Sequence, residues 1–218
     1  MSVTTKRWDG SGWVTSLRPT PTFVATSNAA STATVPAPSG IAEGDLLIHA
    51  VGYDPNTGKA NDYLADGWWP LGGCSASYYS HLFLTARWVE AGEPSSYYLP
   101  GTTDYDVLHV LVAYRGVRLV VPHAYGAGSA SNSGTIPSFN TVEDNALVVL
   151  VTEAHAGSGP SWTWPAGFTE TSNNSRWFPV IGTAAKEQAT AGPTGSLSFS
   201  VTSYLRDYTQ GVALALYP

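Results

Sequence analysis

This sequence predicts an all-β fold, and two observations carry the prediction. Only 12% of its 218 residues are charged, whereas glycine (22), proline (15) and aromatic residues (12%) are frequent, which favours short strands divided by turns over helices. The apolar run at 44–53 is also echoed at 144–151, and both runs are short and rich in leucine and β-branched residues, as in buried strands. We therefore expect an antiparallel β-sandwich, jelly-roll-like, built from two similar halves.

The two halves, about 21–118 and 119–218, can be laid over each other with an offset near one hundred. Because a single half has few large apolar residues, we expect both halves to share one core, with approximate internal two-fold symmetry. The period of two in a strand places Tyr97 and Leu99 on the core face and Tyr98 outside, and likewise Leu197 and Phe199 inside. The matching positions, in chain order, are 34–36 with 135–137, Glu43 and Leu47 with Glu143 and Leu147, 67–68 with 167–168, 91–92 with 191–192, 97–99 with 197–199, and 109–114 with 212–217.

Residues 1–20 are predicted to form a separate hairpin or docking arm. Trp8 and Trp13 flank a turn that contains Asp9 and Gly10, a pair suited to a tight hairpin, so the two indoles are expected to pair across it. An isolated two-stranded hairpin is marginal in water and needs a surface to dock on. That surface can be the body of the same chain or another subunit.

Charge and cysteine content exclude several classes of partner. The formal net charge is -6 with ten Lys and Arg and no basic run, which argues against nucleic-acid binding and membrane association. Cys74 is the single cysteine, so neither an internal disulfide nor a cysteine-rich metal cage can form. The N-terminus lacks the apolar region of a secretory signal, so we expect synthesis in a cytoplasm and no membrane insertion.

Catalytic or metal-binding chemistry finds no support in residue spacing. The five histidines form no metal-binding pattern, and the carboxylates that a glycosidase would need lie in ordinary turns or loops. We expect no enzymatic activity, no catalytic residue, no metal site and no cofactor. The carboxylates considered are Glu90, Glu93, Asp104, Asp106, Glu153 and Asp207.

Aromatic side chains are the most suggestive candidates for binding. Where two aromatic residues are adjacent on a strand, one ring should face away from the core, where it can stack on a sugar or anchor a protein interface. The alternative is that one ring fills the sandwich while the other supports a loop. We expect a binding site in the segments 61–79 and 155–179. The candidate glycan or partner contacts are Trp68, Trp69, Tyr78, Tyr79, Trp162 and Trp164.

With these motifs laid out, the chain resembles a family of phage virion β-sandwich proteins that occur in tails, especially of phages that infect actinobacteria. The segment Lys6–Val14 is similar to Lys-x-Trp-Asp-Gly-Ser-x-Trp-Val segments in minor tail proteins of such phages. The remaining similarity covers about residues 20–218. It lies in Gly40–Leu47, Gly67-Trp68, Ala91–Tyr97, Val112–Val117, Trp164–Glu170 and Gly211–Leu216.

The resemblance implies a non-enzymatic virion component, made in the host cytoplasm, and assigns no active site. The expected position is a minor tail or tail-tip subunit. Its arm, with Trp8, Asp9, Gly10 and Trp13, is expected to dock on other virion proteins, while the sandwich contacts its neighbours or the host envelope. A homo-oligomer is the default for such proteins, and we expect a trimer. Two alternatives stay open: a capsid decoration or head-fibre protein, and a carbohydrate-binding receptor module that reads host cell-wall glycan.

Overall fold

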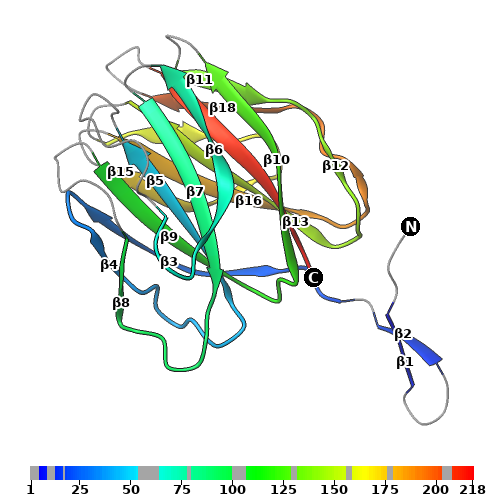
Figure 1. Cartoon of the computed structure of the whole chain (residues 1–218). Helices are drawn as coiled ribbons and strands as arrows, with labels where there is room; N and C mark the ends of the chain where they lie inside the picture. The colour runs from blue at the N-terminus through cyan, green and yellow to red at the C-terminus, as the bar shows by residue number, and fades with distance from the viewer. Residues whose placement is uncertain are drawn as a thin grey trace.

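The computed structural model describes ten stretches of the chain, and all regular structure in them is β-strand (Figure 1). No helix occurs in these stretches, and the sheets are antiparallel and packed face to face, so the prediction of an all-β antiparallel sandwich is confirmed. The described residues are 5–8, 13–16, 18–53, 64–77, 80–99, 107–128, 132–155, 159–175, 179–202 and 208–218.

Two five-stranded sheets form the body, and each comes from one half of the chain. The strand order is the same in both: the first strand of the half lies at one edge, the last lies beside it, and the remaining three follow in the same sequence. The first sheet runs β3 (Thr22–Ala30), β9 (Val107–Arg115), β5 (Leu46–Tyr53), β7 (Ser80–Trp88) and β6 (Trp69–Ser77). The second runs β10 (Leu119–Gly128), β19 (Thr209–Tyr217), β13 (Ala146–Ala154), β16 (Val180–Gln188) and β15 (Thr169–Ser175).

Small sheets cover the outer faces of the two large ones. On the first half the cover is β4 (Thr34–Pro36) paired with β8 (Ser96–Tyr98). On the second half it is the three-stranded sheet β11 (Ser133–Ile136), β18 (Leu197–Thr202) and β14 (Ser161–Thr163). A short pair, β12 (Asn140–Thr141) with β17 (Gly192–Pro193), lies beside it in the chain.

This layering explains why the central strands are apolar on both faces. Every residue of β5 and of β13 is buried. One face of each strand contributes to the core between the large sheets, where Leu46 and Ile48 meet Leu147 and Val149. The other face packs under its own small sheet, forming separate clusters on the first half and on the second half.

The alignment of the halves needs one correction in these central strands. We had matched Leu47 with Leu147, but Leu47 faces the outer cluster of its half, whereas Leu147 faces the core between the sheets. The structural counterpart of Leu47 is Val148, which lies in the outer cluster of the second half. A shift of one residue in a strand reverses the face of every side chain, so the burial pattern fixes the offset here at 101.

The predicted alternation in the covering strands is confirmed. Tyr97 and Leu99 are buried, whereas Tyr98 is 73% exposed. Leu197 and Phe199 are likewise buried. Each of these inward side chains belongs to the apolar cluster between the small and the large sheet of its own half. None of them lies in the core between the two large sheets.

The N-terminal arm is a two-stranded hairpin, β1 (Thr5–Trp8) and β2 (Trp13–Ser16), in which Trp8 lies opposite Trp13. It forms a sheet of its own and lies apart from the sandwich (Figure 1). The following segment does touch the body, because the Asn145 side-chain amide donates to the Arg18 carbonyl over 3.2 Å. Asp9 and Gly10, at the turn, lie outside the described residues.

The sandwich has two different ends. Residue Thr22 pairs with Arg115 and Leu119 pairs with Tyr217, so the arm and the C-terminus leave from one end. At the opposite end, β5 and β13 finish and β7, β9, β16 and β19 begin. The connections to these strands include 54–63, 100–106 and 203–207, which lie outside the described residues.

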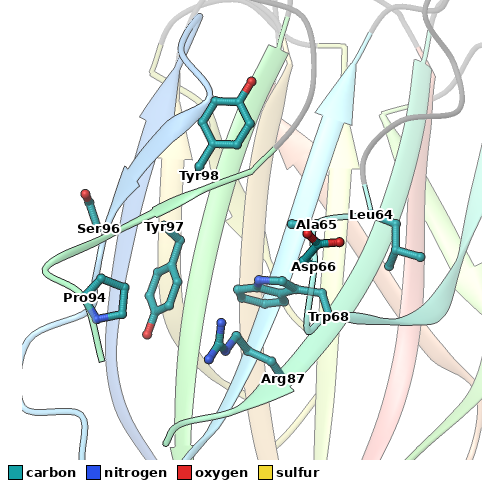
Figure 2. Close-up of a pocket in the computed structure, with 9 residues that line it drawn as sticks. All are labelled: Leu64, Ala65, Asp66, Trp68, Arg87, Pro94, Ser96, Tyr97 and Tyr98. Carbon is teal, nitrogen blue, oxygen red and sulfur yellow. The ribbon is translucent and has the colours of Figure 1, made fainter. Parts of the chain in front are cut away.

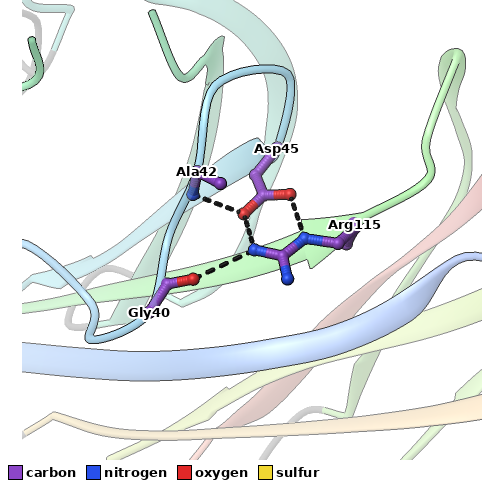
Figure 3. A network of polar contacts seen from close by, with 4 residues as sticks. All are labelled: Gly40, Ala42, Asp45 and Arg115. Carbon is purple, nitrogen blue, oxygen red and sulfur yellow. Dashed lines mark hydrogen bonds and ion pairs between the residues drawn. The ribbon is translucent and has the colours of Figure 1, made fainter. Parts of the chain in front are cut away.

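An ion pair between buried Asp45 and exposed Arg115 ties the first half together at the end that carries the arm (Figure 3). Asp45 is 2% exposed, and its carboxylate accepts two bonds from Arg115, at 2.9 Å from Nε and 2.8 Å from Nη2. The Ala42 amide also donates to Asp45 over 2.8 Å, and Arg115 reaches the Gly40 carbonyl at 3.0 Å. The pair therefore links the turn before β5 to the end of β9.

We expect Asp45→Ala to lower the melting temperature more than Arg115→Ala. The first change removes the acceptor of both the guanidinium and the Ala42 amide, whereas the second leaves the amide bond in place and opens the carboxylate to water. Arg115→Lys should fall between wild type and Arg115→Ala, because an ammonium cannot bind both oxygens in the same geometry. Thermal unfolding followed by circular dichroism measures all three, and an equal or larger loss in Arg115→Ala would contradict this ordering.

A second stability prediction concerns Gly182 in β16, over which the Trp162 indole lies. A Cβ added to Gly182 would meet Trp162 Nε1 at 2.5 Å, closer than real side chains approach. Gly182→Ala should therefore reduce the free energy of unfolding by about 1–3 kcal/mol through overpacking. Urea denaturation tests this, with Thr169→Ala on the exposed part of β15 as the control; equal stability of the two variants would show that the indole moves freely.

Candidate functional site

The candidate site is a pocket of about 440 Å³ on the outer flank of the first half (Figure 2). It lies between the covering strand β8 and the segment 64–68 that leads into β6, and Arg87 of β7 also lines it. These elements are held by the outer cluster, in which Trp68 and Tyr97 pack with Leu47 and Leu111. The same residues that close the core thus form the wall of the pocket.

Arg87 lies between two aromatic rings in that wall. Its guanidinium carbon is 5.8 Å from the centre of the Trp68 ring and 5.4 Å from that of Tyr97, within cation–π range. The two rings meet edge to face at 5.8 Å. Glu93 fixes the arginine from behind, accepting from Nη2 over 2.7 Å, and the same carboxylate oxygen accepts the Glu90 amide over 2.8 Å.

The polar atoms behind the wall are incompletely paired. The Tyr97 hydroxyl and Glu93 Oε2 are buried and face each other, but they do not form a hydrogen bond of normal geometry, and no other described residue bonds to either atom. Burial raises the pKa of the Tyr97 hydroxyl well above its ordinary value, and the neighbouring Glu93 carboxylate raises it further. Tyr97 is therefore a neutral side chain at physiological pH.

The rim of the pocket holds exposed apolar surface beside polar groups. Tyr98 is the most exposed of the large apolar side chains described, at 73%, and Leu64 is 49% exposed. Asp66 and Ser96 add a carboxylate and a hydroxyl to the lining. The pocket therefore offers flat aromatic surface together with hydrogen-bond donors and acceptors.

A buried pair of histidines lies under this wall. His49 Nε2 is 2.9 Å from His109 Nδ1, the rings stack at 5.2 Å, and Trp68 meets His49 edge-on at 5.8 Å. Burial lowers the pKa of both, that of His109 to about 4, so both are neutral at pH 7. His49 Nδ1 lies 3.2 Å from the Thr85 hydroxyl, so every N–H is paired when His109 donates to His49 and His49 donates to Thr85. His109 Nε2 is then a buried acceptor, for which the described residues provide no donor.

A second polar cluster lies between the two large sheets, near the end opposite the arm. Glu153 of β13 is 1% exposed, and its Oε2 accepts from Gln210 over 2.6 Å and from the Ser80 hydroxyl of the first half. Burial raises the pKa of Glu153 to about 8, against the smaller lowering effect of these two bonds. The Cys74 thiol faces the same cluster, and burial followed by the Glu153 charge raises its pKa to about 12. A mostly protonated carboxyl thus joins the two halves.

This geometry predicts a pH dependence of stability that Glu153→Gln should remove. Because the pKa of Glu153 is higher in the folded than in the unfolded protein, its contribution to the free energy of unfolding is complete below the unfolded pKa of 4.5. This contribution is lost as pH rises through about 8. Between these values the difference between wild type and Glu153→Gln should change by up to about 1.4 kcal/mol per pH unit. Urea denaturation at several pH values measures it.

The matched control for that series is Glu90→Gln, which changes an exposed glutamate. The difference in stability between wild type and Glu90→Gln measures the effect of removing a carboxylate from an exposed position. If the free energy of unfolding of wild type and of Glu153→Gln changed in parallel between pH 4.5 and 8, the buried carboxyl group of Glu153 would not be neutral. The histidines act in the opposite direction at acidic pH and cancel in the comparison, because both proteins contain them.

The other aromatic candidates are mostly enclosed. We had expected one ring of Trp68 and Trp69 to face outward, but Trp68 is 6% exposed and Trp69 is half-buried against the core between the sheets. The physical reason is that both faces of this sheet are covered. Trp162 is 7% exposed and stacks with half-buried Trp164 at 5.5 Å, and Trp164 donates to Glu170 over 2.9 Å. Tyr78 and Tyr79 lie outside the described residues.

The remaining candidates for chemistry are dispersed. Glu93 is engaged by Arg87, Glu153 is buried between the sheets, and Asp104, Asp106 and Asp207 lie outside the described residues. Within the described part of the chain, no three His, Cys, Asp or Glu side chains are grouped as a metal site would require. The same part of the chain contains no helix long and apolar enough to cross a membrane.

Sequence reasoning had named Trp68 and the Tyr97-Tyr98 pair, but had not brought them together with Arg87. Arg87 is 19 residues from Trp68 and 10 from Tyr97 in the chain, so only the pairing of β7 beside β6 and the return of β8 over the sheet join them. Comparison of the chain with protein-family models, with curated proteins and with solved structures finds no match. The site is therefore interpreted from its own geometry.

Proposed function

We propose that this chain is a non-enzymatic structural component of a phage virion, a minor tail or tail-tip protein that takes part in assembly and in contact with the host surface. The observation that carries the proposal is the hairpin arm, which forms its own sheet apart from the sandwich. The similarity of Lys6–Val14 to segments of minor tail proteins supports the same assignment.

The arm is suited to docking on a neighbouring subunit. A two-stranded hairpin has too little buried surface to be stable alone, so its strands need a partner surface. The described strands of the sandwich do not pair with β1 or β2, and the segment after them is bonded to the body at Arg18 and at Thr20. Trp8 and Trp13, placed opposite each other, bring two residues of the type that dominates interface energetics.

The two ends of the sandwich suit a subunit that bridges an assembly and its surroundings. The arm and the C-terminus share one end, which is tied by the Asp45–Arg115 pair. The strand ends at the opposite end lead into several connections, and connections carried by a rigid scaffold are where binding surfaces usually lie. We therefore assign the arm end to docking and the outer surfaces of the sandwich to external contacts.

The direct test is the composition of the particle. Mass spectrometry of purified virions from the phage that encodes this chain should find it, and cryo-electron microscopy should place it in the tail. Density on the capsid would replace the tail assignment with a decoration role, and consistent absence from purified particles would overturn the proposal.

The arm makes a more specific prediction. Trp8→Ala/Trp13→Ala should reduce incorporation into virions by more than about tenfold, because truncating central interface aromatics typically costs 2 kcal/mol or more. Val142→Ala, which shortens an exposed apolar side chain of the sandwich, is the control and should be incorporated normally. Circular dichroism on both purified variants should give the wild-type melting temperature. Normal incorporation of the double variant would exclude the arm as the docking element.

A further inference from the structure

The duplicated fold offers an internal comparison for the pocket on the first half. Gly67 and Gly167 occupy matching turns, both with positive φ (78° and 84°), and a Cβ at each would point at Arg87 and at Lys186 respectively. The second half therefore builds the same junction between a large sheet and its cover. It does so with Phe168, Lys186, Leu197 and Ser198 in place of Trp68, Arg87, Tyr97 and Tyr98.

The two junctions differ in side chains that the fold does not require. Leu197 fills the outer cluster of the second half as Tyr97 does in the first, so closing the junction requires an apolar side chain but no phenol. Nor does it require an exposed ring, since Ser198 stands where Tyr98 is 73% exposed. The Tyr97 hydroxyl and the exposed Tyr98 ring are therefore not required to close the junction, and a binding role accounts for them.

The arrangement of these side chains selects the kind of ligand. An exposed aromatic ring gives an apolar face with a polar hydroxyl at its edge, which suits a ligand that has both C–H faces and hydroxyl groups. Asp66 supplies acceptors, Ser96 can donate or accept, and Arg87 Nη1 is a donor with no acceptor among the described residues. A volume of about 440 Å³ lies in the range of small-molecule sites.

Charge narrows the choice further. Glu93 neutralises Arg87 through the 2.7 Å ion pair, so the guanidinium is not a free anion-binding group. The Asp66 carboxylate then leaves the pocket slightly negative, within a chain of formal net charge -6. Phosphate, sulfate and uronic acid groups are therefore disfavoured, and a neutral ligand is favoured.

From these observations we infer that the pocket lined by Trp68, Arg87, Tyr97 and Tyr98 binds a neutral saccharide ring. Tyr98 and Ser96 lie on the outer face of β8, on the other side of the strand from Tyr97 and Arg87, so the sugar ring stacks on Tyr98 and bonds to the Ser96 hydroxyl at the rim of the pocket (Figure 2). The inference rests on the proposed virion function only for the source of the sugar, which is then a neutral glycan of the host envelope.

The test titrates the full chain with free saccharides and follows saturation-transfer NMR and backbone amide shifts. The neutral probes are the methyl glycosides of glucose, galactose, mannose, arabinose and N-acetylglucosamine. Glucuronic acid and sialic acid serve as anionic probes, and a proline-rich peptide tests the other common ligand of aromatic grooves. We expect at least one neutral probe to bind, with shifts confined to residues around β8 and 64–68.

Variants then locate the site. Tyr98→Ala should weaken binding of that probe by roughly 3- to 10-fold, the range of an aromatic contact. Tyr98→Phe should retain the stacking and most of the affinity, and Val142→Ala, at an exposed position on the other half, should bind as wild type does. Because Tyr98 is exposed, its replacement should leave the melting temperature unchanged.

Each outcome decides between the alternatives. Absence of binding by every neutral probe, preference for the acids or the peptide, or unchanged affinity in Tyr98→Ala would overturn the saccharide site. The virion proposal would survive such a result, because incorporation depends on the arm. Conversely, saccharide binding by a chain absent from virions would leave the pocket assignment standing and remove the phage context.

Discussion

Both faces of each central strand must be covered, and the rest of the architecture follows from this constraint. β5 and β13 are buried along their whole length, so packing two sheets together satisfies only one face of each strand. The second face is satisfied within each half, by β4–β8 on one side and by β11–β18–β14 on the other. Four layers result, and one large apolar cluster fills each of the three spaces between them.

Buried polar residues form two clusters, one between the large sheets and one under the small sheet of the first half. Glu153, Ser80 and Gln210 lie between the large sheets near the end from which the long connections leave, and they bond one half to the other. His49 and His109 lie on the outer face instead, under Trp68. Both groups remain neutral because ionisation in these positions would require a charge in an apolar surrounding. Neutral polar clusters of this kind fix how layers are placed without the cost of a buried charge.

Much of the fold could be predicted from the sequence because strand periodicity is local. The period of two placed Tyr97 and Leu99 inward and Tyr98 outward, as the structure has them. The same rule places Trp68 and Trp69 on opposite faces of the sheet, as the structure has them. The ring that faces away from the core between the sheets is nevertheless buried, because the small sheet covers that face. Strand periodicity also could not determine which residue of the second half corresponds to Leu47. A run that is apolar on both faces has no alternation of polar and apolar residues by which to align it.

The candidate site was less predictable, because its parts come from different strands. Arg87 joins Trp68 and Tyr97 only after three strands are paired and layered, and the His49–His109 contact crosses 60 residues of chain. No spacing in the sequence reports such contacts. Equivalent positions in the two halves show which side chains the fold requires, because both halves have the same strand order. Side chains that differ between the halves are then candidates for function.

That comparison also bears on how a duplicated fold can acquire a binding role. The junction of the second half is filled by Leu197 under a cover that includes β14, and Trp162 of β14 is locked over Gly182. In the first half Tyr97 fills the equivalent place, and its ring extends to the guanidinium of Arg87. The larger ring fills the core with its apolar part and places its buried hydroxyl beside the Arg87–Glu93 pair. Because the outer clusters of the two halves are separate, such a change on one flank leaves the core between the sheets intact. The side chains of a covering strand can thus differ between the two flanks while the doubled central strands continue to determine the fold.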